Sequence, residues 1–141
     1  MLDWLVGQLK LPRDAIFIAG RSLGSGVAVQ VASAQNVAGL ILISPYDRLI
    51  NVVRMRVRFF PETLLQDKFE STGHTKRVLC PVLVIYGEKD TTVPPMLSQN
   101  LFTGWTGHYL EHCVPEGGHR GLLRYASVES AIANFLDRVT W

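Results

Sequence analysis

Three side chains in this 141-residue chain have the types and the order that nucleophilic catalysis needs. Ser22 lies between two glycines in GRSLG (20–24), Asp90 ends the segment YGEKD, and His119 ends the segment PEGGH. A serine hydroxyl needs a base to take its proton, and the base needs an acid to orient it. Serine, aspartate and histidine in this chain order therefore predict a triad that attacks an acyl carbon.

The residues around Ser22 predict a sharp turn between a strand and a helix. The apolar run AIFIAG precedes the serine, and the small-residue segment SGVAVQVASAQ follows it. Such a turn strains the serine backbone, and we expect that only glycine at positions 20 and 24 leaves room for it. The backbone N–H of Leu23 would then donate to an oxyanion from the start of the helix. The alternative is a glycine-rich turn without chemistry.

Other carboxylates and histidines could fill the two remaining roles. Glu88 and Asp47 are alternatives to Asp90 as the acid, and Asp90 is favoured because it lies further along its loop and leads into VPP. His108 and His112 have even spacing on a predicted strand and face the same side, so we expect them to be partly buried structural residues. His74 lies in a polar loop, so His119 is the preferred base.

Apolar, β-rich segments alternate with helix-like segments along the chain. The pattern predicts strands at 15–20, 37–45, 80–90 and 108–118, helices at 2–11, 25–35, 93–105 and 122–141, and helical pieces broken at Pro61 within 46–69. This alternation indicates an α/β domain with a mostly parallel sheet of about four strands and helices on both faces. In such sheets ligands bind beyond the carboxyl ends of the strands, where the three candidate residues lie.

Composition excludes several classes of protein. Apolar residues make up 48% of the chain and charged residues 18%, as in one globular domain, and a net charge of +2 argues against nucleic acid or an anionic membrane as partner. No run of 18 apolar residues occurs, and the first residues lack the pattern of a secretory signal. We expect Cys80 and Cys113 to be buried thiols in a reducing cytoplasm, and we expect no metal or organic cofactor.

Four segments together resemble α/β-hydrolase-fold serine hydrolases: GRSLGSG (20–26), SPYD (44–47), PVLVIYGEKDTTVP (81–94) and GGHRGLL (117–123). The likeness is strongest to a small, esterase-like branch with the elbow G-R-S-L-G-[ST]-G. It implies Ser22 as nucleophile, Asp90 as acid, His119 as general base and a small acyl compound as substrate. It also implies that the four strands are the last four of eight. Residues 1–141 would then be a single domain, the C-terminal half of the fold, without the N-terminal strands.

Two expectations follow from this resemblance. The family takes its second oxyanion donor from a loop after an upstream strand, which belongs to the missing N-terminal part of the fold. With one donor fewer, we expect weak hydrolysis of an ester, thioester or amide. The strand at 15–20 would be an apolar edge, so we expect a homodimer in which two antiparallel copies of this strand complete an eight-stranded sheet. The rival hypothesis is a non-catalytic module that self-associates through this edge.

Several polar residues near the predicted strand ends have less specific signals. Arg54, Arg56 and Arg58 could contact an anionic substrate near the mouth of the site, but a solvated helix face is the more common origin of such a pattern. Arg21 is expected to point away from the pocket and to form a structural ion pair. Tyr46 is a candidate for the wall of the pocket.

Overall fold

The computed structural model describes residues 2–65 and 68–139. Its strands are β1 (Phe17–Arg21), β2 (Gly39–Ile43), β3 (Val82–Gly87) and β4 (Tyr109–Val114). Its helices are α1 (Leu2–Leu9), α2 (Leu23–Ala34), α3 (Leu49–Arg54), α4 (Thr72–Thr75), α5 (Pro95–Phe102) and α6 (Ala126–Val139). Short 3₁₀ turns cover Arg13–Ala15, Glu62–Leu64 and Leu122–Arg124.

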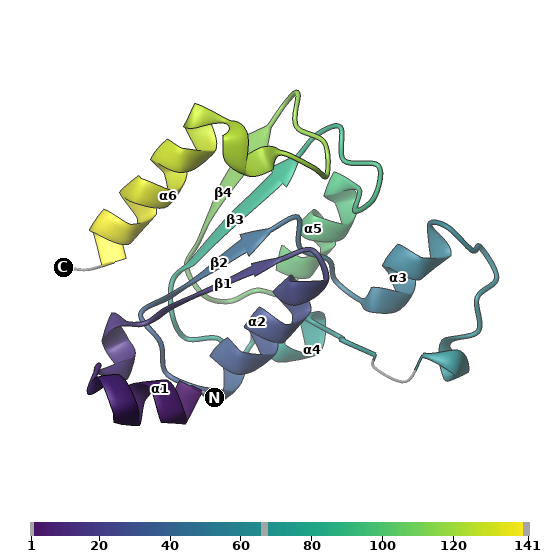
Figure 1. Ribbon diagram of the computed structural model, residues 1–141. Helices are drawn as coiled ribbons and strands as arrows, with labels where there is room; N and C mark the ends of the chain where they lie inside the picture. The colour runs from purple at the N-terminus through teal and green to yellow at the C-terminus, as the bar shows by residue number, and fades with distance from the viewer. Residues whose placement is uncertain (1, 66–67, 140–141) are drawn as a thin grey trace.

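The four strands form one sheet in the order of the chain, β1-β2-β3-β4, and every pair is parallel (Figure 1). Each pair is joined by a crossover that contains at least one helix. The carboxyl ends of all four strands therefore meet at one edge of the sheet. This confirms the predicted α/β architecture: β2, β3 and β4 lie within their predicted ranges, and β1 extends one residue beyond its range, to Arg21.

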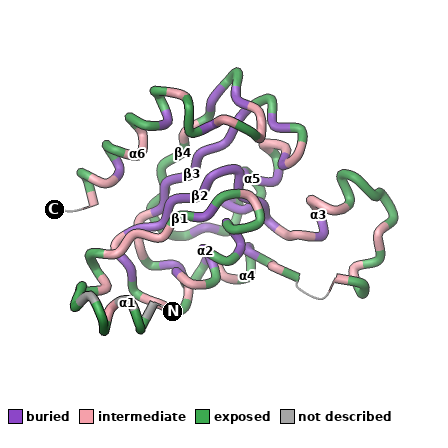
Figure 2. Tube along the Cα trace, in the orientation of Figure 1, coloured by how far each residue is buried: buried purple, intermediate pink, exposed green. Residues whose placement is uncertain are grey.

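Helices cover both faces of the sheet, as the sequence predicted. Successive residues of a strand point to opposite faces, so Leu40 and Leu42 pack with α2 and α5, whereas Ile41 and Ile43 pack under α6. Every residue of β2 and β3 is buried, which explains why these strands are continuous apolar runs (Figure 2). The two packed layers hold the strand ends in fixed positions.

The segment between β2 and β3 has less helix than predicted. Helix α3 ends at Arg54, and the next turns expose Met55, Val57 and Phe59, the last by 87%. Most of the stability of a helix in a protein comes from packing of a buried face, and this segment has none. Ion pairs of Arg48 with Glu62 and Glu70 connect the end of this segment to the start of α3. Arg54, Arg56 and Arg58 are all exposed.

The prediction of two buried thiols is wrong for Cys113, which is exposed on β4, while Cys80 is half-buried. β4 is an edge strand, and five of its six residues are exposed or only half-buried. The edge position explains the error, because an alternating strand pattern does not distinguish an edge strand from a central one. Both cysteines are free, as expected. Partial loss of solvent around each sulfur raises the pKa of both thiols, so neither is activated as a nucleophile.

β1 forms the other edge of the sheet. A groove of about 770 Å³ runs beside it, lined by Phe17, Ile18 and Ala19 of the strand and by Val27 and Val31 of α2. Self-association through this edge stays a prediction. In the described part of the chain, none of the helices is both long and apolar enough to cross a bilayer.

Phe135 of α6 is the central side chain of the layer that α6 forms on one face of the sheet. It is 1% exposed and meets the ring of Phe17 edge-on, with 6.1 Å between the ring centroids. Phe135→Ala should lower the free energy of unfolding by about 3–5 kcal/mol, because it opens a cavity between α6 and the sheet. Leu123→Ala, at a side chain that is 57% exposed, is the matched control and should cost less than about 1 kcal/mol. Urea unfolding measures both, and equal losses would contradict this account of the layer.

Candidate active site

Ser22 occupies a strained turn between β1 and α2. Its backbone has φ 50° and ψ −122°, a conformation that residues with a side chain rarely adopt. Its N–H donates to the carbonyl of Ile43 at 2.9 Å, so the turn begins where the β1–β2 ladder ends. Its carbonyl accepts from the N–H of Ser25 at 2.9 Å and from the Ser25 hydroxyl at 2.6 Å. These three hydrogen bonds hold the serine in a sharp turn between the strand and the helix.

The two glycines of the motif differ in what surrounds them. A Cβ on Gly20 would lie 2.5 Å from the carbonyl oxygen of Gly24 and 2.6 Å from the Cβ of Ala28. A Cβ on Gly24 would meet nothing within 4 Å. The expectation that crowding requires glycine is therefore correct at position 20 and wrong at position 24, because Gly24 lies on the open side of α2.

The first N–H of α2, that of Leu23, points out of the start of the helix. The peptide bond is planar and trans, so this N–H points opposite to the Ser22 carbonyl, which the two Ser25 contacts hold against the helix. The first N–H groups of a helix have no partner within it, and the helix dipole adds positive potential there. The Leu23 N–H is thus placed to donate to a negatively charged oxygen beside the Ser22 hydroxyl.

Asp90 lies in the loop after β3, and its side chain is completely buried. One carboxylate oxygen accepts from the N–H of Thr92 at 2.9 Å and from that of Val93 at 2.8 Å. The other oxygen lies 2.8 Å from Nδ1 of His119. Because an ionised carboxylate only accepts hydrogen bonds, the proton of the neutral imidazole is on Nδ1 and Nε2 keeps its lone pair.

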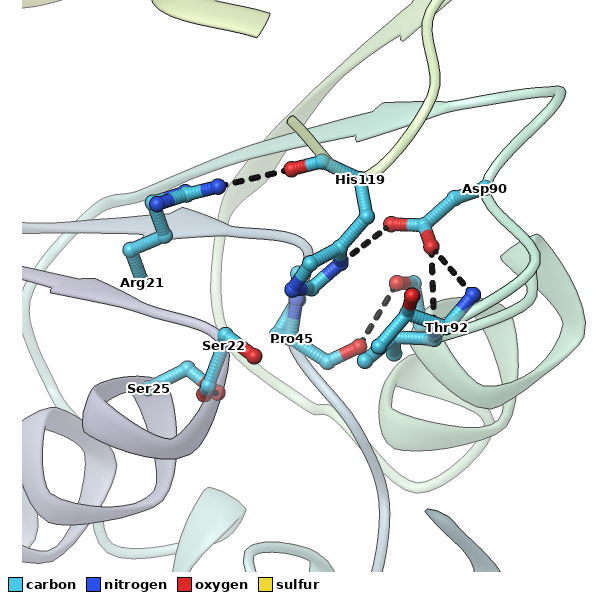
Figure 3. A network of polar contacts seen from close by, with 9 residues as sticks. Arg21, Ser22, Ser25, Pro45, Asp90, Thr92 and His119 are labelled. Atoms are coloured by element: carbon cyan, nitrogen blue, oxygen red, sulfur yellow. Dashed lines mark hydrogen bonds and ion pairs between the residues drawn. The ribbon is translucent and has the colours of Figure 1, made fainter. Parts of the chain in front are cut away.

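His119 lies in the glycine-rich loop after β4, with 18% of its side chain exposed. Figure 3 shows its ring between Asp90 and Ser22, with the Ser22 side chain on the side of the ring opposite Asp90. The backbone carbonyl of His119 accepts a hydrogen bond from Nη2 of Arg21 at 2.7 Å. The described contacts include no hydrogen bond between Ser22 and the imidazole. Catalytic hydrogen bonds are often long or poorly aligned until substrate binds.

The alternative acids and bases have other partners. Asp47 is buried and accepts from the N–H of Arg48 at 2.7 Å and from the side chain of Asn51 at 2.8 Å, so it organises the start of α3. Glu88 has no hydrogen bond to His119 among the described contacts. The structure therefore brings together Asp90, and not either rival, with His119.

The other histidines lie outside this cluster. His74 lies between Ser33 and Arg77 on the surface near α2. His112 of β4 is half-buried and lies 3.2 Å from the hydroxyl of Ser127, whereas His108 is exposed. His112 thus fits the expected structural role, and His108 is more exposed than predicted because it precedes an edge strand.

Tyr46 and Arg21 have roles that the sequence did not indicate. Tyr46 is only 1% exposed, so it does not line an open pocket, and its hydroxyl donates to the carbonyl of Leu23 at 3.3 Å. Burial raises its pKa to about 12, which keeps it neutral beneath the elbow. Arg21 makes a hydrogen bond with a backbone carbonyl in place of the expected ion pair. Neither contact leaves a signal in the sequence, because each joins residues that are far apart in the chain.

Ser44, at the end of β2, adds a second strained position at the same edge of the sheet. It has φ 46°, is fully buried, and its hydroxyl has no partner among the described atoms. Across the described residues, no cluster of three or more His, Cys, Asp or Glu side chains could hold a metal ion.

Comparison with known proteins identifies this arrangement of strands and helices. The chain is 35% identical over 137 residues to the uncharacterized protein Rv2307c of Mycobacterium tuberculosis. The match covers 95% of this chain and 49% of that protein. It is 27% identical over 135 residues to the alpha/beta hydrolase domain-containing protein aho-3 of Caenorhabditis elegans, covering 96% of this chain and 40% of that one. No family model matches the sequence.

Solved structures give the same result for the fold. An acetyl xylan esterase from Paenibacillus sp. R4 superimposes with a TM-score of 0.78 at 18% identity, over 97% of this chain and 49% of the esterase. An acylaminoacyl peptidase from Pyrococcus horikoshii superimposes with a TM-score of 0.75 at 13% identity, over 96% of this chain and 25% of the peptidase. The chain has an α/β-hydrolase fold, and it spans about half the length, or less, of the curated relatives it matches.

The crowding at Gly20 gives a test of the elbow. Gly20→Ala should destabilise the fold by about 1–3 kcal/mol, because the added methyl group meets the backbone of Gly24 and the Cβ of Ala28. Gly24→Ala adds the same methyl group in open space and should be neutral or stabilising by up to about 1 kcal/mol, because alanine favours the helix. Urea unfolding of both variants checks the contrast, and equal effects would show that the described elbow is wrong.

Proposed function

We propose that this chain is a serine hydrolase domain that cleaves a small ester, thioester or amide through an acyl-enzyme intermediate. One observation carries the proposal: a fully buried Asp90 carboxylate lies 2.8 Å from Nδ1 of His119, next to a strained serine at the start of a helix. The fold adds support, since the matched proteins include an esterase and a peptidase.

The proposed reaction begins with Nε2 of His119 as the base. It takes the proton of the Ser22 hydroxyl while Oγ attacks the acyl carbon, and the carbonyl oxygen becomes an oxyanion that accepts from the Leu23 N–H. The imidazolium then gives its proton to the leaving group as the bond to the acyl carbon breaks. Water attacks the acyl-enzyme by the reverse sequence of proton transfers and releases the acid.

Asp90 has two tasks in this scheme. It holds the imidazole in the tautomer that presents Nε2 to Ser22, and its charge stabilises the imidazolium. The two backbone N–H bonds from Thr92 and Val93 keep the carboxylate in place when the charge on the ring changes. The scheme uses no metal and no organic cofactor.

Labelling with a fluorophosphonate, read by intact mass, tests the proposal. The chain should gain one phosphonyl group, because His119 activates the Ser22 hydroxyl, and Ser22→Ala should abolish the gain. Ser33→Ala, which removes a half-buried serine hydroxyl elsewhere on α2, is the matched control and should label like the parent. A folded parent chain that does not label would refute the proposed function.

The second candidate is a non-catalytic module that self-associates through the edge of β1 as a homodimer. The observation that favours it is the apolar groove between β1 and α2, whose wall includes Val27, 46% exposed. An apolar strand edge in water is a site for pairing with another strand. The two candidates differ in catalysis, but self-association is itself compatible with hydrolysis, because the groove lies beside the strand and the proposed triad lies beyond its carboxyl end.

Sedimentation velocity at micromolar concentration tests the dimer. The chain should sediment as a dimer, and Val27→Glu should shift it to monomer because a charge enters the groove. Val57→Glu places the same charge at a valine that is 53% exposed in the segment after α3, so this control should stay dimeric. A monomeric parent chain would contradict self-association.

A further inference from the structure

Arg21 joins the two halves of the candidate site directly. Its guanidinium donates to the carbonyl of His119, 98 residues away, at 2.7 Å (Figure 3). Arg21 is covalently bonded to Ser22, so this contact ties the backbone of the serine to the backbone of the histidine. β1 and β4 lie at opposite edges of the sheet, and no strand pairing connects them.

The loop that carries His119 is fixed as far as Gly117, whose carbonyl accepts from the N–H of Lys89 at 2.9 Å, and the contact with Arg21 extends this support to His119 itself. The loop contains Gly117, Gly118 and Gly121, and Gly121 has φ 84°, so its backbone has more freedom than one with side chains. The described hydrogen bonds of His119 are two: Nδ1 to Asp90 and the carbonyl to Arg21. A ring held only at Nδ1 could pivot about that atom and move Nε2 away from Ser22. The second contact fixes the backbone from which the ring projects.

We infer that Arg21 is a positioning residue, whose hydrogen bond to the His119 carbonyl keeps the imidazole aligned with the Ser22 hydroxyl. This inference rests on the proposed function. Arginine suits the task because its guanidinium stays charged at all relevant pH values and makes short, charge-assisted hydrogen bonds. The side chain is exposed, so the contact adds little to the stability of the fold. Its effect should fall on reactivity.

Arg120 provides a matched control. It follows His119 directly and is exposed, and the described contacts give it no hydrogen bond to the site. Arg120→Met removes the same charge from the neighbourhood of the same imidazole as Arg21→Met does, but it leaves the His119 carbonyl contact intact. A purely electrostatic effect would therefore appear in both variants, whereas a positioning effect would appear only in Arg21→Met.

The experiment measures the rate of fluorophosphonate labelling against pH for the full chain, Arg21→Met, Arg21→Lys and Arg120→Met. Arg21→Met should lower the plateau rate about 10- to 100-fold, since small displacements of a reacting group cost rates of that order. Arg21→Lys should recover part of the loss, because an ammonium group can still donate. Arg120→Met should keep the plateau within about two-fold, and both methionine variants should share any shift of the pH midpoint.

Hydrogen–deuterium exchange gives a second readout that does not depend on chemistry. Arg21→Met should speed exchange in a peptide covering 115–121, and Arg120→Met should not, while the urea midpoints of both stay near that of the parent. Equal plateau rates for the parent and Arg21→Met, or unchanged exchange at 115–121, would overturn the inference and leave the proposed function standing. A parent chain that does not label would overturn both.

Discussion

The candidate acid Asp90 and the candidate base His119 meet because two backbone segments cross at Gly87 and Gly117 with no side chain between them. A Cβ on Gly87 would lie 2.1 Å from the carbonyl oxygen of Gly117, closer than any packing allows. Two hydrogen bonds fix the crossing. The N–H of Lys89 donates to the carbonyl of Gly117 at 2.9 Å, and the N–H of Glu88 donates to the carbonyl of Val114 at 3.0 Å. The loop after β3 and the loop after β4 are thus held at one separation, which lets Asp90 reach His119.

The candidate nucleophile, Ser22, depends on a different constraint, its own strained backbone. Strain of this kind costs about 1–3 kcal/mol and persists only where the surroundings fix the conformation. Here the ladder with β2 fixes the residue from one side and Ser25 fixes it from the other. Tyr46 adds support from below, where its ring packs so close to Gly26 that a side chain there would collide with the hydroxyl. The crowded turn at Ser22 and the close crossing of Gly87 and Gly117 together define the candidate site.

The sequence was sufficient to predict the features that follow from local patterns. Continuous apolar runs predicted β2 and β3, because strands buried on both faces need no polar residues. Placing Ser22, Asp90 and His119 after three different parallel strands was enough to predict that they share one edge of the sheet. The spacing alone left Asp47 and Glu88 open as acids, and only the fold separates them from Asp90.

Other features depend on contacts between distant segments, which no local pattern records. The motif makes Gly20 and Gly24 look equivalent, but only Gly20 faces Ala28, so the difference requires the packing of α2 on β1. Arg21 offers no sign that its partner is a carbonyl 98 residues later. The exposure of Cys113 and of the segment after Arg54 depends on which surfaces stay uncovered, and apolar residues there were indistinguishable from core residues in the sequence.

The candidate base, His119, depends on the least protected strand of the sheet. β4 exposes Tyr109, Leu110 and Glu111, and the segment that carries His119 begins where this strand ends. Proteins open locally at such edges with free energies well below that of global unfolding. Detachment of β4 would withdraw the imidazole while the layer of β1, β2 and α2 stays folded. The candidate nucleophile and the candidate base would then belong to cooperative units of different stability, and heat or denaturant should separate them before β1, β2 and β3 unfold.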